Sequence, residues 1–201
     1  MIADFLSPAF LQAACAHPHK KVNEIRIFFT SAVSSMPVFV SCVGEIEVQY
    51  YEDGVLKTKT FTDLEEAQLG GVTADVHSYV TIYGNVTYIN VAGPPASAVG
   101  DVDLKDCTTL TYISLYCSNL NKLVMPDDDA AVNNCSIEAD NLFELHCRSD
   151  RSLIASSMAS AIAYSDNNNG YLYTNDDGAY YDTIANAATA KGWNIITSND
   201  Q

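Results

Sequence analysis

The chain has 201 residues, of which 25 are acidic and 10 are basic, so its formal net charge at pH 7 is −15. Apolar residues make up 48% of the sequence, a share typical of folded proteins rather than of disordered acidic segments. A strongly acidic chain is repelled by phosphate backbones and by anionic lipid headgroups. We therefore expect a hydrophobic core, and neither nucleic acid nor a membrane as a partner.

The N-terminal segment, residues 1–20, is apolar but lacks the basic start of a signal peptide, since Asp4 stands where a positive charge is needed. Ser7 followed by Pro8 is typical of a helix start, which predicts a short helix to about Ala16. The apolar side chains of this segment either pack on the chain's own domain or form an assembly arm that attaches to another protein. The contact residues of such an arm are Ile2, Phe5, Leu6, Phe10 and Leu11.

Residues 21–75 are typical of an antiparallel β-sandwich-like module. The segment is rich in β-branched and aromatic residues, and apolar residues alternate over 45–51. Glu52-Asp53-Gly54 is a hairpin turn signal between two of its strands. The strands are expected over 22–30, 38–42, 45–51 and 55–62.

Residues 76–150 carry a repeat of apolar pairs spaced i, i+2. From Leu104 onward, the second members of successive pairs are 11, 10, 12 and 10 residues apart, too few for a helical crossover between parallel strands. Each pair fits one short strand with both side chains inward. We therefore predict a short leucine-rich-repeat parallel β-solenoid within a β-rich α+β fold. The pairs are Val80/Ile82, Ile89/Val91, Val102/Leu104, Ile113/Leu115, Leu123/Met125, Cys135/Ile137 and Leu145/Cys147.

Residues 151–201 are expected to form an α/β cap for the solenoid. Apolar residues near helical spacing alternate here with short β-rich runs, and Gly192 fits the position after a helix C-terminus. The expected order is a helix over 153–164, a strand over 171–174, a helix that begins at Asp177 or Gly178 and runs to about Lys191, and a strand over 193–197.

The six cysteines include no C-x-x-C pair and no zinc-finger spacing. Their even number permits three disulfides, but the last four fall in or beside apolar positions of the repeat. Buried thiols in a reducing compartment are the better interpretation for those four, which are Cys107, Cys117, Cys135 and Cys147.

Three segments resemble a known family. The tract 104–119, LKDCTTLTYISLYCSN, resembles the leucine-rich repeats of Bacteroidetes surface proteins and their phages. The hairpin 44–62 resembles the β module that precedes such repeats, and the ending 177–193 resembles the cap that follows them. The resemblance implies a non-enzymatic adhesin or interaction scaffold. Because the chain begins without a secretion or lipoprotein signal, it resembles more a phage virion component, a head fibre, tail fibre or decoration protein, held by its N-terminal arm as a homo-oligomer.

Strand parity places a set of polar and aromatic residues on the outer face of the predicted solenoid. Such a face suits a protein or carbohydrate partner, although a plain solvated sheet has the same pattern. The candidate binding residues are Tyr83, Tyr88, Asn90, Asp103, Ser114, Tyr116, Glu138, Glu144 and His146.

Catalytic motifs are weak in this sequence. Glu144 and His146 share one face of a strand and offer an acid–base pair, which keeps a hydrolase as a contrasting hypothesis. The acidic run 127–129 lacks the ligand order of a calcium loop. No nucleophile elbow, phosphate loop or dinucleotide fingerprint occurs. We expect a virion protein without cofactor or metal, and a bacterial cell-surface adhesin as the alternative.

Overall fold

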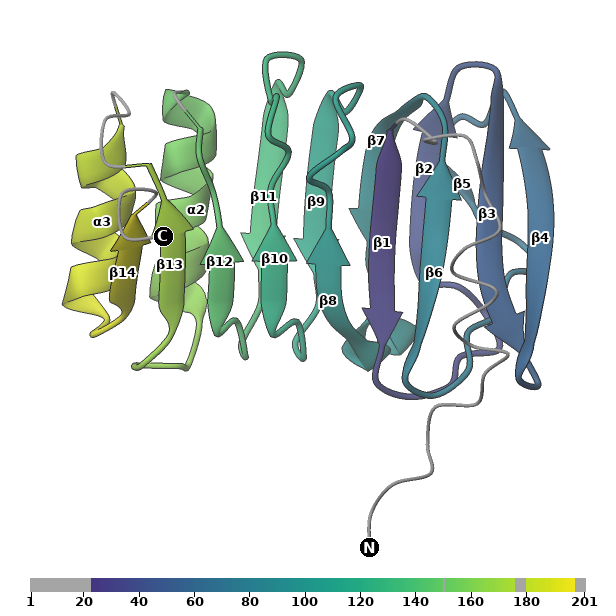
Figure 1. The fold of residues 1–201 in the computed structure, drawn as a ribbon, viewed down its shortest axis with the longest axis horizontal. Coiled ribbons are helices and arrows are strands. Elements are labelled where there is room, and N and C mark those ends of the chain that lie inside the picture. Colours follow the sequence, from purple (N-terminus) through teal and green to yellow (C-terminus); the bar gives the residue numbers. More distant parts are fainter. Residues whose placement is uncertain (1–22, 150, 176–179, 198–201) are drawn as a thin grey trace, which may run out of the picture.

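The computed structural model describes residues 23–149, 151–175 and 180–197. The described chain forms two β-sheets packed face to face, with two α-helices at the C-terminal end. In Figure 1 the larger sheet faces the viewer, and the smaller sheet and both helices lie behind it.

The larger sheet has nine strands and mixed pairing. In spatial order the strands are β14 (Asn194–Thr197), β13 (Tyr171–Thr174), β12 (Glu144–His146), β10 (Lys122–Val124), β8 (Val99–Asp103), β1 (Glu24–Phe29), β6 (Ser78–Tyr83), β3 (Glu45–Glu52) and β4 (Val55–Thr62). Strands from β14 to β8 run parallel to one another, whereas each neighbouring pair from β8 to β4 is antiparallel.

The smaller sheet has five strands and is also mixed. The strand order is β11 (Asn134–Glu138), β9 (Tyr112–Tyr116), β7 (Val86–Val91), β2 (Val38–Cys42) and β5 (Ala67–Gln68). Strands β11, β9 and β7 are parallel, and β2 is antiparallel to both of its neighbours. The 3-10 helix η1 (Pro94–Ala98) connects the two sheets between β7 and β8.

The prediction of a leucine-rich-repeat parallel β-solenoid in a β-rich α+β fold is wrong. The described chain is mostly β, in two mixed sheets, with only two α-helices. The apolar pairs do mark strands, but successive pairs fall on opposite sheets: Leu115 lies in the smaller sheet and Leu123 in the larger one. Both sheets also continue into antiparallel strands, because β8 pairs with β1 and β7 pairs with β2.

The predicted α/β cap is partly compatible with the structure. Helix α2 (Ser152–Tyr164), β13, helix α3 (Tyr181–Ala190) and β14 follow in the expected order, but the two strands extend the larger sheet. The indole Nε1 of Trp193 donates a hydrogen bond to the Asn167 carbonyl over 2.8 Å. The domain boundaries drawn at residues 20, 75 and 150 stay predictions.

The core lies between the two sheets and continues under α2 and α3. The buried apolar residues form one cluster from Ile25 to Trp193. In both sheets, inward apolar residues alternate with outward polar ones, the pattern of strands that are buried on one face. Burial of this one face drives the association of the two sheets.

The interpretation of the last four cysteines as buried thiols is confirmed. Cys107, Cys117, Cys135 and Cys147 are free and buried, as is Cys42. Burial raises the pKa of the Cys117, Cys135 and Cys147 thiols to about 12, since the apolar surroundings disfavour the thiolate.

We expect these three thiols to resist alkylation in the folded protein. A pKa near 12 instead of 9.0 leaves roughly a thousandfold less thiolate at neutral pH. Peptide mass spectrometry after iodoacetamide treatment should find Cys117, Cys135 and Cys147 unlabelled under native conditions and labelled in guanidinium chloride. Fast native labelling of these residues would contradict their burial.

Gly170 tests the packing of the C-terminal end. A Cβ at this position would lie 2.5 Å from Trp193 Cε2 and 2.7 Å from the Phe143 carbonyl oxygen. We expect Gly170→Ala to lower the free energy of unfolding by about 1–3 kcal/mol, measured by urea denaturation. Gly70→Ala is the matched control, because its nearest neighbour is 3.9 Å away. Equal effects of the two substitutions would refute this packing.

Candidate functional site

The nine candidate binding residues lie on two opposite faces of the molecule. Each points outward, since it alternates along its strand with at least one adjacent residue that is buried in the core. Four of them belong to the larger sheet and five to the smaller sheet. The first group is Tyr83, Asp103, Glu144 and His146; the second is Tyr88, Asn90, Ser114, Tyr116 and Glu138.

The candidate assembly arm lies outside the described residues. Its five contact residues are Ile2, Phe5, Leu6, Phe10 and Leu11.

A charged cluster stands on the outer face of the larger sheet. Glu144 Oε1 lies 2.6 Å from both Lys122 Nζ and His146 Nε2. In the register of β8 and β10, Asp101 is opposite Lys122. Burial alone would raise the pKa of Glu144, but the hydrogen bonds from Lys122 and His146 outweigh it and lower that pKa below its usual value. Glu144 is thus held as a carboxylate that accepts hydrogen bonds, which does not suit a general acid.

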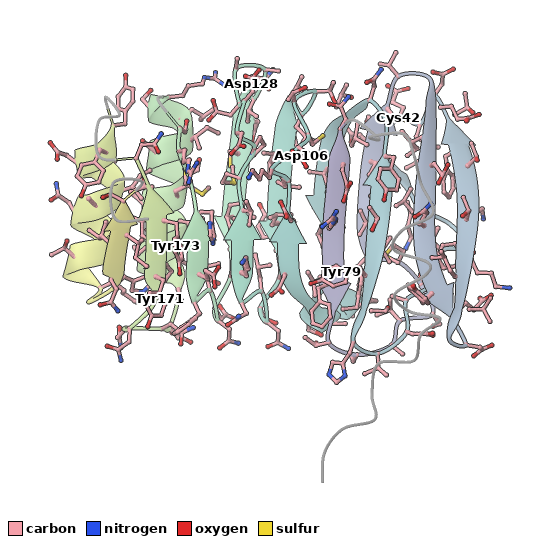
Figure 2. All side chains as sticks on the ribbon, viewed as in Figure 1. Cys42, Tyr79, Asp106, Asp128, Tyr171 and Tyr173 are labelled. Atoms are coloured by element: carbon pink, nitrogen blue, oxygen red, sulfur yellow. The ribbon has the colours of Figure 1, made fainter. Side chains whose placement is uncertain are left out.

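Aromatic side chains flank this cluster on the same face. The rings of His146 and Tyr173 are stacked, with centroids 4.2 Å apart and planes 5° apart. Figure 2 shows Tyr171 and Tyr173 toward the C-terminal end of this face and Tyr79 over the antiparallel half. Tyr83 is four strands away from Glu144, about 19 Å at the usual strand spacing, so these two candidate residues do not share a site.

A strip of small polar residues crosses the outer face of the smaller sheet. Asn90, Ser114 and Ser136 lie opposite one another in the register of β7, β9 and β11, and tyrosines stand on both sides of them. Ser114 is only 2% exposed. We call this surface the tyrosine-bordered strip; its floor is Asn90, Ser114 and Ser136, and its borders are Tyr88, Tyr112 and Tyr116.

The bordering tyrosines are held in place by contacts with their neighbours. The rings of Tyr88 and Tyr112 are stacked, with centroids 4.6 Å apart. On the other side, Tyr116 is 43% exposed, and its hydroxyl shares a hydrogen bond of 3.4 Å with the Ser136 hydroxyl. These contacts fix the rings around the floor of the strip.

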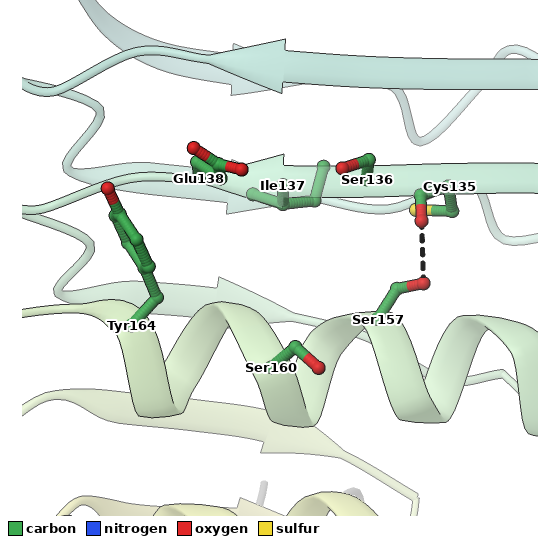
Figure 3. A pocket seen from close by; sticks show the side chains of 7 residues that line it. All are labelled: Cys135, Ser136, Ile137, Glu138, Ser157, Ser160 and Tyr164. Atoms are coloured by element: carbon green, nitrogen blue, oxygen red, sulfur yellow. Dashed lines mark hydrogen bonds between the residues drawn. The ribbon is translucent and has the colours of Figure 1, made fainter.

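A pocket of about 280 Å³ continues the strip between β11 and α2 (Figure 3). Ser136 lines both the strip and the pocket. From the helix side, Ser157 Oγ donates a hydrogen bond to the Cys135 carbonyl over 2.7 Å. Ser160 and Tyr164 also come from the helix side, and Glu138 lies opposite Tyr164 (Figure 3). The lining is therefore rich in hydroxyl groups.

The pocket also reaches the open edge of the smaller sheet. Strand β11 is the last strand of that sheet, and the Glu138 carbonyl accepts a hydrogen bond from the Cys117 N–H on the β9 side over 3.0 Å. Because backbone groups of successive residues in a strand point to opposite sides, those of Cys135 and Ile137 point away from β9, toward α2. The Ser157 hydroxyl satisfies one of these groups, the Cys135 carbonyl.

The floor of the strip contains an unsatisfied acceptor. Among the described residues, no group donates a hydrogen bond to Asn90 Oδ1, although this atom is buried. Leaving a buried polar atom without a partner costs about 1–3 kcal/mol.

Sequence reasoning identified the strand residues of this surface but missed its helix side. Ser157, Ser160 and Tyr164 are spaced i, i+3 and i+7, which places them on one helical face. Helical periodicity could have grouped them. Their position beside β11 has no local sequence signal, since it depends on how α2 packs against the sheet edge.

No protein-family model, no curated protein and no solved structure matches this chain. Within residues 23–149, 151–175 and 180–197, no group of three or more His, Cys, Asp or Glu side chains is arranged to hold a metal ion. The same residues include no helix long and apolar enough to span a membrane.

The lowered pKa of Glu144 predicts a pH-dependent contribution to stability. A carboxyl group with a lowered folded pKa stabilises the protein above its usual value of 4.5, and this stabilisation is lost as the pH falls through the folded pKa. We expect Glu144→Gln to lower the free energy of unfolding by less than about 1 kcal/mol at pH 7.

Urea denaturation from pH 7 to acid pH measures this difference, which should shrink as the pH falls below 4.5. Glu65→Gln, at an exposed position outside the cluster, is the control. A difference for Glu144→Gln that stays constant with pH would show that the cluster does not hold the carboxylate.

Proposed function

We propose that this chain is a non-enzymatic structural and binding protein of a bacteriophage particle, a head fibre, tail fibre or decoration protein. The observation that carries the binding role is the tyrosine-bordered strip, in which aromatic and polar side chains stand fixed on a rigid sheet and lead into a hydroxyl-lined pocket. Rigid surfaces of this kind bind partners with little loss of side-chain entropy. The phage location is supported by the sequence resemblance.

In this proposal the N-terminal segment, residues 1–20, attaches the chain to another virion protein, and several copies assemble as a homo-oligomer. The described part of the chain then stands away from the attachment point and displays its sheet faces. The net charge of −15 keeps displayed copies apart by electrostatic repulsion.

Mass spectrometry of purified phage particles tests the location. We expect this chain among the particle proteins, and immunogold labelling to place it on the particle surface. Its absence from particles would overturn the virion role. Recovery from the bacterial cell surface instead would favour the alternative, an adhesin or interaction scaffold that binds protein or glycan.

Deletion of residues 1–20 tests the arm. We expect the truncated chain to keep its circular dichroism spectrum and melting temperature, because the described residues from Ile25 onward form one continuous core. We expect it to be missing from particles that carry the full-length chain. Particle-bound truncated protein would assign attachment to another surface.

A further inference from the structure

We propose that the tyrosine-bordered strip and the pocket at its end bind a neutral oligosaccharide that lies across β7, β9 and β11 toward α2. The inference rests on the proposed binding role, and it names the chemical class of the ligand.

The hydrogen-bonding groups of the site match the hydroxyl groups of a sugar. The floor offers the Ser136 hydroxyl, and the pocket offers those of Ser157, Ser160 and Tyr164. The Ser157 and Ser160 hydroxyls already donate to the backbone carbonyls of Cys135 and Ser156. Their oxygens keep the capacity to accept a hydrogen bond from a sugar hydroxyl.

The bordering tyrosines suit the apolar faces of sugar rings. A tyrosine ring offers an apolar surface with a hydroxyl at its edge, and sugar rings likewise combine C–H faces with hydroxyl edges. The stacking of Tyr88 on Tyr112 and the hydrogen bond between Tyr116 and Ser136 hold these rings before a ligand binds. Little rotamer entropy is then lost on binding.

The charge of the site selects for a neutral ligand. The strip contains no lysine, arginine, aspartate or glutamate, and the pocket contains one carboxylate, Glu138, and no basic side chain. Against a net charge of −15, sialylated, uronic or phosphorylated glycans are repelled. A protein partner anchored by an apolar side chain is also disfavoured, because it would bury the floor hydroxyls without hydrogen bonds.

The dimensions favour an oligosaccharide over a single sugar. Asn90 and Ser136 are two strand spacings apart, about 10 Å. The pocket adds about 280 Å³ beyond Ser136. A chain of sugar units occupies both parts, with its rings between the tyrosine borders and its end in the pocket.

A glycan array followed by titration calorimetry tests the proposal with the full-length protein. The array contains neutral glucans, mannans and galactans together with sialylated and uronic-acid glycans. We expect binding to neutral oligosaccharides only. A lack of binding to every neutral glycan, or binding confined to the anionic set, would overturn the proposal.

Two substitutions locate the site. Tyr116→Ala removes one border, and Ser160→Trp fills the pocket from an exposed helix position; we expect each to weaken binding at least tenfold with an unchanged melting temperature. Tyr79→Ala is the matched control, because Tyr79 is 48% exposed on the opposite sheet, and it should leave affinity unchanged. Loss of affinity in Tyr79→Ala alone would move the site to the other face and overturn the assignment.

The experiments can refute glycan binding and the phage location independently of each other. A chain present in particles that binds no neutral glycan refutes the inference and leaves the virion role intact. A chain absent from particles whose strip binds neutral oligosaccharides refutes the virion role and supports the inference.

Discussion

The structure depends on one constraint: the apolar face of each sheet must be buried. The two sheets bury each other over most of the described chain, and α2 and α3 cover the larger sheet at the C-terminal end. The short strands β9, β10, β11 and β12 have one or two inward apolar residues each, too few to form a core alone. Leu115 and Ile137 of the smaller sheet and Leu123 and Leu145 of the larger sheet belong to the same buried cluster. If the two sheets separated, the inward apolar residues of both would be exposed to water.

The same constraint determines where polar side chains stand. Since inward and outward positions alternate along each strand, burying one set places the other on the two outer surfaces. The larger sheet therefore displays the salt-bridged cluster around Glu144, and the smaller sheet displays serines and tyrosines. The two outer faces differ in chemistry. The larger sheet carries a carboxylate that is already partnered by Lys122 and His146. The smaller sheet carries serines, tyrosines and Glu138, and its Asn90 Oδ1 receives no hydrogen bond from the described residues.

The sequence predicts which residues are buried but not which sheet receives them. Periodicity of two residues located most strands, and the helix after residue 152 followed its apolar spacing. The interval of 10 to 12 residues, however, is compatible both with adjacent strands of one sheet and with strands that alternate between two sheets. In the structure, Val102, Leu123 and Leu145 are neighbours across β8, β10 and β12, 21 and 22 residues apart. That pairing depends on chain reversals between the sheets, for which the sequence has no signature comparable to the Asp53-Gly54 turn.

The pocket arises because a helix takes the place where the smaller sheet would otherwise gain another strand. After β12 the chain enters α2 before it returns to the larger sheet as β13, so β11 keeps an open edge. A helix satisfies its own backbone groups and cannot pair with that edge along its length; α2 instead reaches it with the Ser157 hydroxyl. Small side chains bring the helix close, and the mismatch between helix and strand leaves space beside Ser136. A binding site at this junction therefore requires no dedicated loop, since it follows from ending one sheet before the other.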